Sequence, residues 1–268
     1  MTQDLSRRLA LKKLVRGVSF LSTSPTCFAA LSSPLSTIPD NDAYWEMVRQ
    51  QFPFREDKVP MNAANLCPSP RQVAEKVVEL TQDIDEDCSF NNRAKFKSML
   101  EHSRCQVANQ LGVTSDEIAL VRNTSEANNI INNGFPLKPG DEIVLWDQNH
   151  PTNNVAWDIR SSRFNSRVKR VKTPTEPTRL DQLITPFMEA IGTNTRVLAL
   201  THVSNISGLR LPIRKLCDLA HQRDIHVHVD GAQTWGSFNL NLRELKCDSY
   251  AASSHKWLCG PKEVVYSM

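Results

Sequence analysis

Short apolar runs bounded by turn residues recur along the second half of the chain. Each is too short for a helix of ordinary length and is rich in Val, Ile, Leu or Ala, so each predicts a buried β-strand. Most of the predicted strands are apolar at nearly every position, which is typical of strands covered on both faces. The predicted strands are residues 117–121, 141–147, 196–203, 225–230, 249–253 and 264–268.

Helical spacing separates these runs. Residues 212–224 place Ile213, Leu216, Cys217 and Ala220 at i, i+3, i+4 and i+7, one face of a helix. A second clear case is 92–111, followed by Gly112 as a C-terminal cap; its apolar residues lie near one helical face and are Phe96, Met99, Leu100, Val107 and Leu111. Further helices are predicted at 43–52, 71–85 and 125–134.

Alternation of strands and helices predicts an α/β fold with a mostly parallel sheet flanked by helices. In such a sheet, ligands bind beyond the carboxyl ends of the strands. The residues that follow each predicted strand are therefore the first place to look for chemistry.

The N-terminus differs in composition from the rest of the chain. Residues 1–31 hold five Lys or Arg and one Asp, a net +4, which leaves −1 for the remainder of a chain whose total is +3. Ser6-Arg7-Arg8 with Leu11-Lys12, followed by a weakly apolar stretch, resembles a twin-arginine export signal, so we expect a periplasmic protein. A disordered basic tail or a short amphipathic helix on a cytoplasmic protein is the alternative.

Charge and cysteine usage exclude several classes. The body of the chain has no basic excess for nucleic acid, and no apolar run is long enough to span a membrane. Seven cysteines form neither a C-x-x-C pair nor a zinc-type cluster, so no metal site is predicted and most are expected to be buried free thiols.

Hydroxyl, imidazole and amide groups follow the first three predicted strands. Thr124 and Ser125 begin the helix after 117–121, where free N–H groups suit a phosphate, although a plain N-cap is the alternative. His150 follows 141–147 and Asn205 follows 196–203. A loop histidine and a turn asparagine are the simpler interpretations of these two.

A carboxylate and an amine lie at the ends of two further predicted strands, 225–230 and 249–253. Asp230 ends an apolar strand, where a buried carboxylate needs a partner, and Gln233 comes three residues later. A structural Asp that caps its own loop is the alternative. Ser253 ends the predicted strand 249–253 and His255 and Lys256 follow it; taken alone, Lys256 is an ordinary surface lysine.

Together these groups fit pyridoxal 5′-phosphate (PLP). This cofactor has an aldehyde for a lysine, a phosphate for hydroxyl and imidazole donors, and a ring nitrogen that a carboxylate keeps protonated. No Gly-rich nucleotide fingerprint supports the competing view of a nucleotide-binding α/β protein.

The motifs also resemble the class V aminotransferases, the fold-type I PLP group that includes cysteine desulfurases and isopenicillin N epimerase-like proteins. The resemblance covers roughly residues 60–268 and follows the order of that group. Its motifs are "NTSEAN", "NHPTNNVAW", "THVSNISG", "HVDGAQTWG" and "SSHKWLCGPKE".

The resemblance implies a role for each candidate. Lys256 would be the Schiff-base lysine and a general acid/base, and Asp230 the partner of the ring nitrogen. His150 would stack on the ring, with Asn205 and Gln233 near its oxygen. The phosphate cradle would be Thr124, Ser125, Ser253 and His255.

We expect three parts: the export signal at 1–31, a linker and arm at 32–70, and, as the family resemblance implies, the PLP-binding large domain of the fold-type I transferase fold at 71–268. The family's smaller C-terminal domain is expected to be absent. We expect an enzyme, a homodimer, that acts on an amino acid or amine and is isopenicillin N epimerase-like. A cysteine desulfurase or lyase subtype and a truncated, non-catalytic PLP-binding chain stay open.

Overall fold

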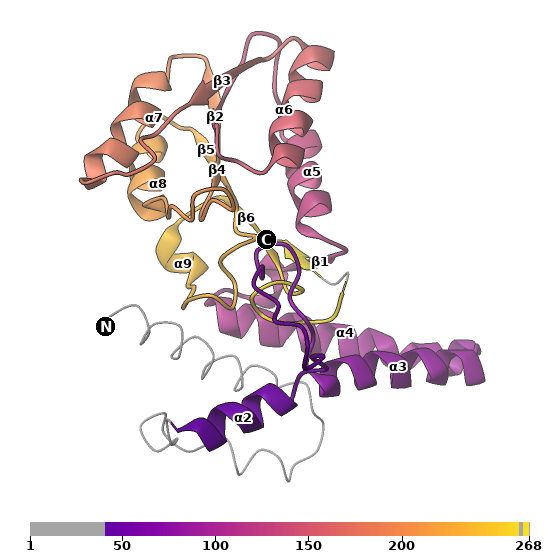
Figure 1. Cartoon of the computed structure of the whole chain (residues 1–268). Helices are drawn as coiled ribbons and strands as arrows, with labels where there is room; N and C mark the ends of the chain where they lie inside the picture. Colours follow the sequence, from indigo (N-terminus) through magenta and orange to yellow (C-terminus); the bar gives the residue numbers. More distant parts are fainter. Residues whose placement is uncertain (1–40, 263–264, 268) are drawn as a thin grey trace. The chain divides into compact units, whose positions relative to one another are not determined.

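The computed structural model describes residues 41–262 and 265–267 (Figure 1). The basic segment interpreted as an export signal lies outside them. The chain divides into two compact units, and each is described by itself. Among the described residues, the first comprises 41–101 with the loops 235–239 and 254–262, and the second comprises 102–234, 240–253 and 265–267. The predicted domain boundary at residue 70 stays a prediction.

The second unit is built on a seven-stranded sheet of order β1-β7-β6-β5-β4-β2-β3. Five neighbouring strands, from β6 to β3 in that order, run parallel, and β7 lies antiparallel between β6 and β1. The strands are β1 (Ala119–Val121), β2 (Glu142–Trp146), β3 (Arg167–Val171), β4 (Thr195–Thr201), β5 (His226–Asp230), β6 (Ser249–Ser253) and β7 (Val265–Ser267). The predicted α/β fold with a mostly parallel sheet is confirmed.

Helices cover both faces of this sheet, with α5 and α6 on one side and α7 and α8 on the other (Figure 1). Their bounds are α5 (Thr124–Gly134), α6 (Pro151–Phe164), α7 (Thr185–Ala190) and α8 (Ile213–His221), with a short α9 (Leu242–Leu245). Two 3-10 turns, η3 (Ser115–Glu117) and η4 (Leu180–Leu183), and the second half of α4 (Phe90–Leu111) complete the described elements of this unit. Strands β2 and β6 are buried along their whole length, because both faces are covered.

Packing confirms one predicted helix face fully and another in part. In α8 the four predicted residues are all buried. In α4 (Phe90–Leu111), only Val107, Ala108 and Leu111 are buried, whereas Leu100 is 52% exposed. The predicted helix over 92–111 is therefore confirmed as α4, and burial of its apolar residues is greatest in its second half, with Phe96 and Met99 half-buried in the first half, which belongs to the other unit.

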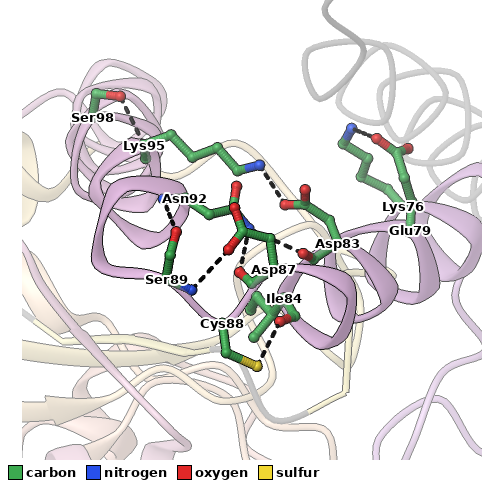
Figure 2. A network of polar contacts seen from close by, with 10 residues as sticks. All are labelled: Lys76, Glu79, Asp83, Ile84, Asp87, Cys88, Ser89, Asn92, Lys95 and Ser98. Atoms are coloured by element: carbon green, nitrogen blue, oxygen red, sulfur yellow. Dashed lines mark hydrogen bonds and ion pairs between the residues drawn. The ribbon is translucent and has the colours of Figure 1, made fainter.

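That other unit contains α2 (Asp42–Gln50), α3 (Arg71–Glu86) and the beginning of α4. Polar contacts fix the corner between α3 and α4 (Figure 2). Asn92 Nδ2 donates to the carbonyls of Asp83 and Asp87 at 3.0 and 2.8 Å, and Lys95 pairs with the Asp83 carboxylate at 2.5 Å. Backbone N–H donation from Ser89 lowers the pKa of the Asp87 carboxyl. The Asn92 side chain thus satisfies two backbone carbonyls at the end of α3.

Candidate functional site

Asp230 lies at the carboxyl end of β5, the middle strand of the sheet, and is 2% exposed. One oxygen, Oδ2, accepts a hydrogen bond from Asn128 Nδ2 at 2.8 Å, and Oδ1 accepts one from the backbone N–H of Ala232 at 3.0 Å. The strand therefore places a carboxylate where a ligand of such a sheet would lie, and donors on two sides compensate part of its desolvation.

Asn128 joins Asp230 to a second buried group. Its Oδ1 lies 2.9 Å from His228 Nε2, and His228 Nδ1 lies 2.8 Å from Ser249 Oγ. Because an ionised carboxylate can only accept, the Asn128 amide must turn its NH₂ toward Asp230 and its oxygen toward His228. His228 consequently donates from Nε2 and accepts from the Ser249 hydroxyl at Nδ1.

His228 is fully buried, and desolvation lowers the pKa of its imidazole to about 3. It is therefore neutral at physiological pH, which the hydrogen-bond directions also require. Ser249, His228 and Asn128 form a relay in which each group donates toward Asp230. The arrangement fixes the carboxylate without placing a positive side chain in that relay.

Thr124 and Ser253 bring two elements of the proposed phosphate cradle together. Thr124 is the first residue of α5 and Ser253 ends β6; both are buried, and their hydroxyls are hydrogen-bonded to each other. Asn123 caps the helix by accepting from the N–H of Glu126 at 2.9 Å, a cap that does not use the first two N–H groups of the helix. Ser125 is exposed at the same helix end.

His150 and Asn205 lie at the next strand ends but are less constrained. His150 is the N-cap of α6, half-buried, and its Nδ1 is 2.7 Å from Thr152 Oγ1. Asn205 is exposed in a turn that Gly208 closes by donating from its N–H to the carbonyl of Ser204 at 2.9 Å. His150 therefore caps a helix and Asn205 lies in a turn, so neither residue needs a ligand to account for its position.

Gln233 is buried in the loop after β5, beside a compact group that the sequence did not reveal. Tyr250 Oη lies 2.5 Å from Thr234 Oγ1 and 3.0 Å from His202 Nδ1. Burial raises the pKa of Tyr250 well above its usual value and lowers that of His202 to about 3. A Cβ at Gly231 would overlap the Tyr250 ring, so only glycine fits directly after Asp230.

His255 and Lys256 belong to the first unit, in the loop 254–262. Both are half-buried, and Lys256 follows Ser253 by three residues along the chain. The Lys256 carbonyl accepts from the Cys259 N–H at 3.0 Å, and the Ser254 carbonyl accepts from the Gly260 N–H at 2.7 Å. Desolvation, reinforced by the positive charge of Lys256, lowers the pKa of His255. The loop is therefore closed by its own backbone on both sides of the lysine.

Sequence reasoning missed Asn128, although the signal was present. It is the last residue of the motif "NTSEAN" and stands four residues after Thr124, so it lies on the same helix face. It also missed Thr201 at the end of β4, a buried residue whose hydroxyl has no hydrogen-bond partner among the described residues. No group of three or more His, Cys, Asp or Glu side chains among the described residues could hold a metal ion.

Comparison with known proteins places these features in one family. Residues 67–265 match the family described as Aminotransferase class-V, which is most of the chain. The chain belongs to this PLP-dependent family.

Relatives within and around the family carry different activities. An isopenicillin N epimerase from Amycolatopsis lactamdurans is 30% identical over 223 residues, which is 82% of this chain and 56% of that protein. The cysteine desulfurase CsdA of Escherichia coli has a similar structure, with a TM-score of 0.68 and 28% identity over 83% of this chain and 57% of that one.

A second solved structure shows likeness of fold alone. It is a mutant of C-DES with glycine covalently linked to its PLP cofactor, at a TM-score of 0.76, 24% identity, and coverage of 82% of this chain and 58% of that one. The chain spans about half the length of the curated relatives it matches, at 56% for two isopenicillin N epimerases.

Proposed function

We propose that this chain forms the cofactor-binding part of a PLP-dependent enzyme that acts on an amino acid or amine. The observation that carries the proposal is Asp230, a buried carboxylate at the end of the middle strand that is oriented by Asn128 and the Ala232 N–H. A site for a protonated pyridine nitrogen needs a buried carboxylate of this kind, so the residues present fit the cofactor.

The other residues fit the remaining parts of the cofactor. Bound PLP supplies an electron sink for negative charge that develops at the Cα of an amino acid. Thr124, Ser125, Ser253 and His255 would donate hydrogen bonds to its phosphate, the first two at the N-terminus of α5. Asn205 and Gln233 would donate to the ring oxygen, and His150 would pack on the ring face.

Lys256 would attach the cofactor covalently and, when released by substrate, would move a proton at the substrate Cα. For the reaction itself, the candidates are the activities of the relatives, which include an epimerase and a cysteine desulfurase. We favour the epimerase-like class, because "HKW" followed by "GPK" resembles that branch. A chain that binds the cofactor without turning over substrate is the competing proposal.

One experiment tests attachment separately from turnover. The purified chain is incubated with PLP, scanned for visible absorbance, reduced with borohydride and mapped by peptide mass spectrometry. We expect the cofactor mass on the Lys256 peptide and none in Lys256→Ala. The matched control is Lys215→Ala, which removes an exposed lysine of α8 and should leave absorbance and labelling unchanged.

Label on a different lysine, or equal absorbance in Lys256→Ala, would contradict the proposal. Turnover of amino acids by the labelled wild-type chain then separates the enzyme from the non-catalytic alternative. Epimerisation and sulfide release are followed as separate readouts, because they distinguish the two classes of relative.

Export by the twin-arginine route and homodimerisation are further proposals. Arg7 and Arg8 within the basic segment support the first, and replacing both by Lys should keep the protein in the cytoplasmic fraction. The exposed apolar side chains of α3 and α4 support the second, because large exposed apolar residues mark interaction surfaces. They include Val77, Val78, Phe90 and Leu100, and light scattering on the purified chain gives the mass that tests it.

No helix among the described residues is long and apolar enough to cross a membrane.

A further inference from the structure

Two cysteines of the first unit meet although 192 residues separate them in the chain. The Sγ atoms of Cys67 and Cys259 are 3.4 Å apart, and both thiols are free. A disulfide bond is about 2.0 Å long, so a small movement would join them. The other described cysteines are Cys88, Cys105, Cys217 and Cys247, and no sulfur–sulfur contact joins any of them to this pair.

Backbone and side-chain contacts hold the two thiols in place. The Cys67 N–H donates to the His255 carbonyl at 3.2 Å, and Ser69 Oγ donates to the Gly260 carbonyl at 2.8 Å. The ammonium of Lys262 donates to the Cys67 carbonyl and lies 3.3 Å from Ser69 Oγ. Residues 67–69 are thus fastened to the loop 254–262 at several points, so the approach of the sulfurs is built into the local fold.

The two thiols differ in exposure and in charge. Cys67 is half-buried and lines a cavity of about 510 Å³ together with Arg55, Lys58 and Lys262. A hydrogen bond from Cys259, helped by the positive charge of Lys262, lowers the pKa of Cys67. Cys259 is 4% exposed, and the neighbouring Cys67 with burial raises its pKa. Cys67 can therefore meet an external oxidant as a thiolate, and Cys259 cannot.

We propose that Cys67 and Cys259 are a reversible redox pair, with Cys67 as the attacking thiol and Cys259 as the resolving thiol. The oxidant is a small disulfide, RSSR. Cys67 thiolate attacks one sulfur of RSSR, which forms a mixed disulfide and expels RS⁻. Cys259 gives its proton to that RS⁻ and attacks the Cys67 sulfur, which expels the second RS⁻.

The step balances as a two-electron exchange. Two protein thiols become one disulfide, and RSSR becomes two RSH, the second RS⁻ taking from solvent the proton that Cys67 released at the start. The product covalently joins residues 67–69 to the loop that also carries Lys256. The effect of the disulfide is local. The hydrogen bonds between residues 67–69 and the loop are retained, and the contact between the two sulfurs becomes a covalent bond.

The wild-type full chain tests the pair without any variant. The protein is equilibrated with oxidised and reduced glutathione, quenched with iodoacetamide and analysed by intact mass and peptide mapping. We expect loss of two alkylatable thiols, a mass lower by two hydrogen atoms, and a cross-linked peptide pair that contains Cys67 and Cys259. A folded protein that gains only glutathione adducts, or a cross-link between other cysteines, would overturn the proposal.

Two serine variants test the order of attack. Cys259→Ser should trap a stable glutathione adduct on Cys67, and Cys67→Ser should give no adduct on the buried Cys259. Cys88→Ser and Cys105→Ser are matched controls at exposed cysteines and should retain the cross-link. Circular dichroism confirms folding, and a Cys259→Ser protein that stays unmodified at Cys67 while folded would contradict the assigned roles. None of these readouts requires bound cofactor, so failure of the pair and failure of the proposed function are distinguishable.

Discussion

Asp230 and Cys67 are both acidic groups, but their surroundings differ. Asp230 is held inside the sheet by Asn128, and the relay behind it is built from neutral, buried groups. Cys67 is half-buried, contacts a second thiol and lies beside an ammonium group at the edge of a cavity. The first arrangement fixes the carboxylate in one orientation, whereas the second holds a thiol that can be oxidised and reduced again.

The largest expected effect tests how rigid the surroundings of Asp230 are. Gly231→Ala would place a methyl group in overlap with buried Tyr250 ring atoms. Because neither side can move freely, we expect the free energy of unfolding to fall by about 3 kcal/mol or more. Gly134→Ala is the control, since a Cβ there meets nothing within 4 Å. Urea denaturation of both variants measures the difference; equal losses would show that the packing after β5 is loose.

Asn128→Ala should have the next largest effect, because it removes a partner from both Asp230 and His228. An unsatisfied buried group costs about 1–3 kcal/mol, so we expect a loss of about 3 kcal/mol in unfolding free energy. Asn129→Ala, one residue along and exposed, should cost under about 1 kcal/mol. If the two variants were equally stable, the relay would not be the element that fixes the carboxylate.

Acid should weaken the sheet unit through its buried imidazoles. The pKa of His228 and of His202 is about 3 in the folded protein and 6.5 as an ordinary histidine. Below pH 6.5 the unfolded chain binds protons that the native state refuses, so stability is lost as the pH falls from 6.5 toward 3. Between about pH 7 and pH 5 the loss is about 2 kcal/mol for each imidazole.

Denaturation curves at these two pH values provide the measurement. The stability difference between them should shrink by about half in His228→Gln, which keeps a polar side chain but cannot titrate. An unchanged difference would mean that His228 is accessible to protons in the folded state.

The smallest expected effect concerns the thiol. Lys262→Gln removes a positive charge that lowers the pKa of Cys67, although the Cys259 hydrogen bond remains the larger cause. We expect iodoacetamide to alkylate Cys67 a few-fold more slowly at neutral pH, with the rate recovering as pH rises. Lys58→Gln, in the same cavity, is the matched control. A faster reaction in Lys262→Gln would show that this lysine shields the thiol rather than activating it.

The elements that the sequence predicted most clearly are those in which all side chains are buried. Strands such as β2 and β6 are buried on both faces, so their apolar runs were unambiguous. It did not predict α6 or β3. Strand β3, "RVKRV", is at the edge of the sheet and carries charge, and α6 mixes polar residues with the buried Trp157.

The residues of the candidate site also divide into those that the sequence predicted and those that it missed. Asp230, Thr124 and Ser253 follow from their places at strand and helix ends, and the structure buries all three. Asn128 and the Tyr250 group depend on pairing between elements distant in sequence, which periodicity does not reveal. The same limit applies to α4, because spacing predicts that Phe96, Met99 and Leu100 share a helix face but does not say what covers that face.

Strand β7 has a consequence for synthesis on the ribosome. Strand β1, at 119–121, pairs only with β7, at 265–267, among the described strands. Its place in the sheet therefore depends on a segment translated about 145 residues later. While the five parallel strands can pair as they emerge, β1 must wait for β7, so this edge of the sheet is completed last.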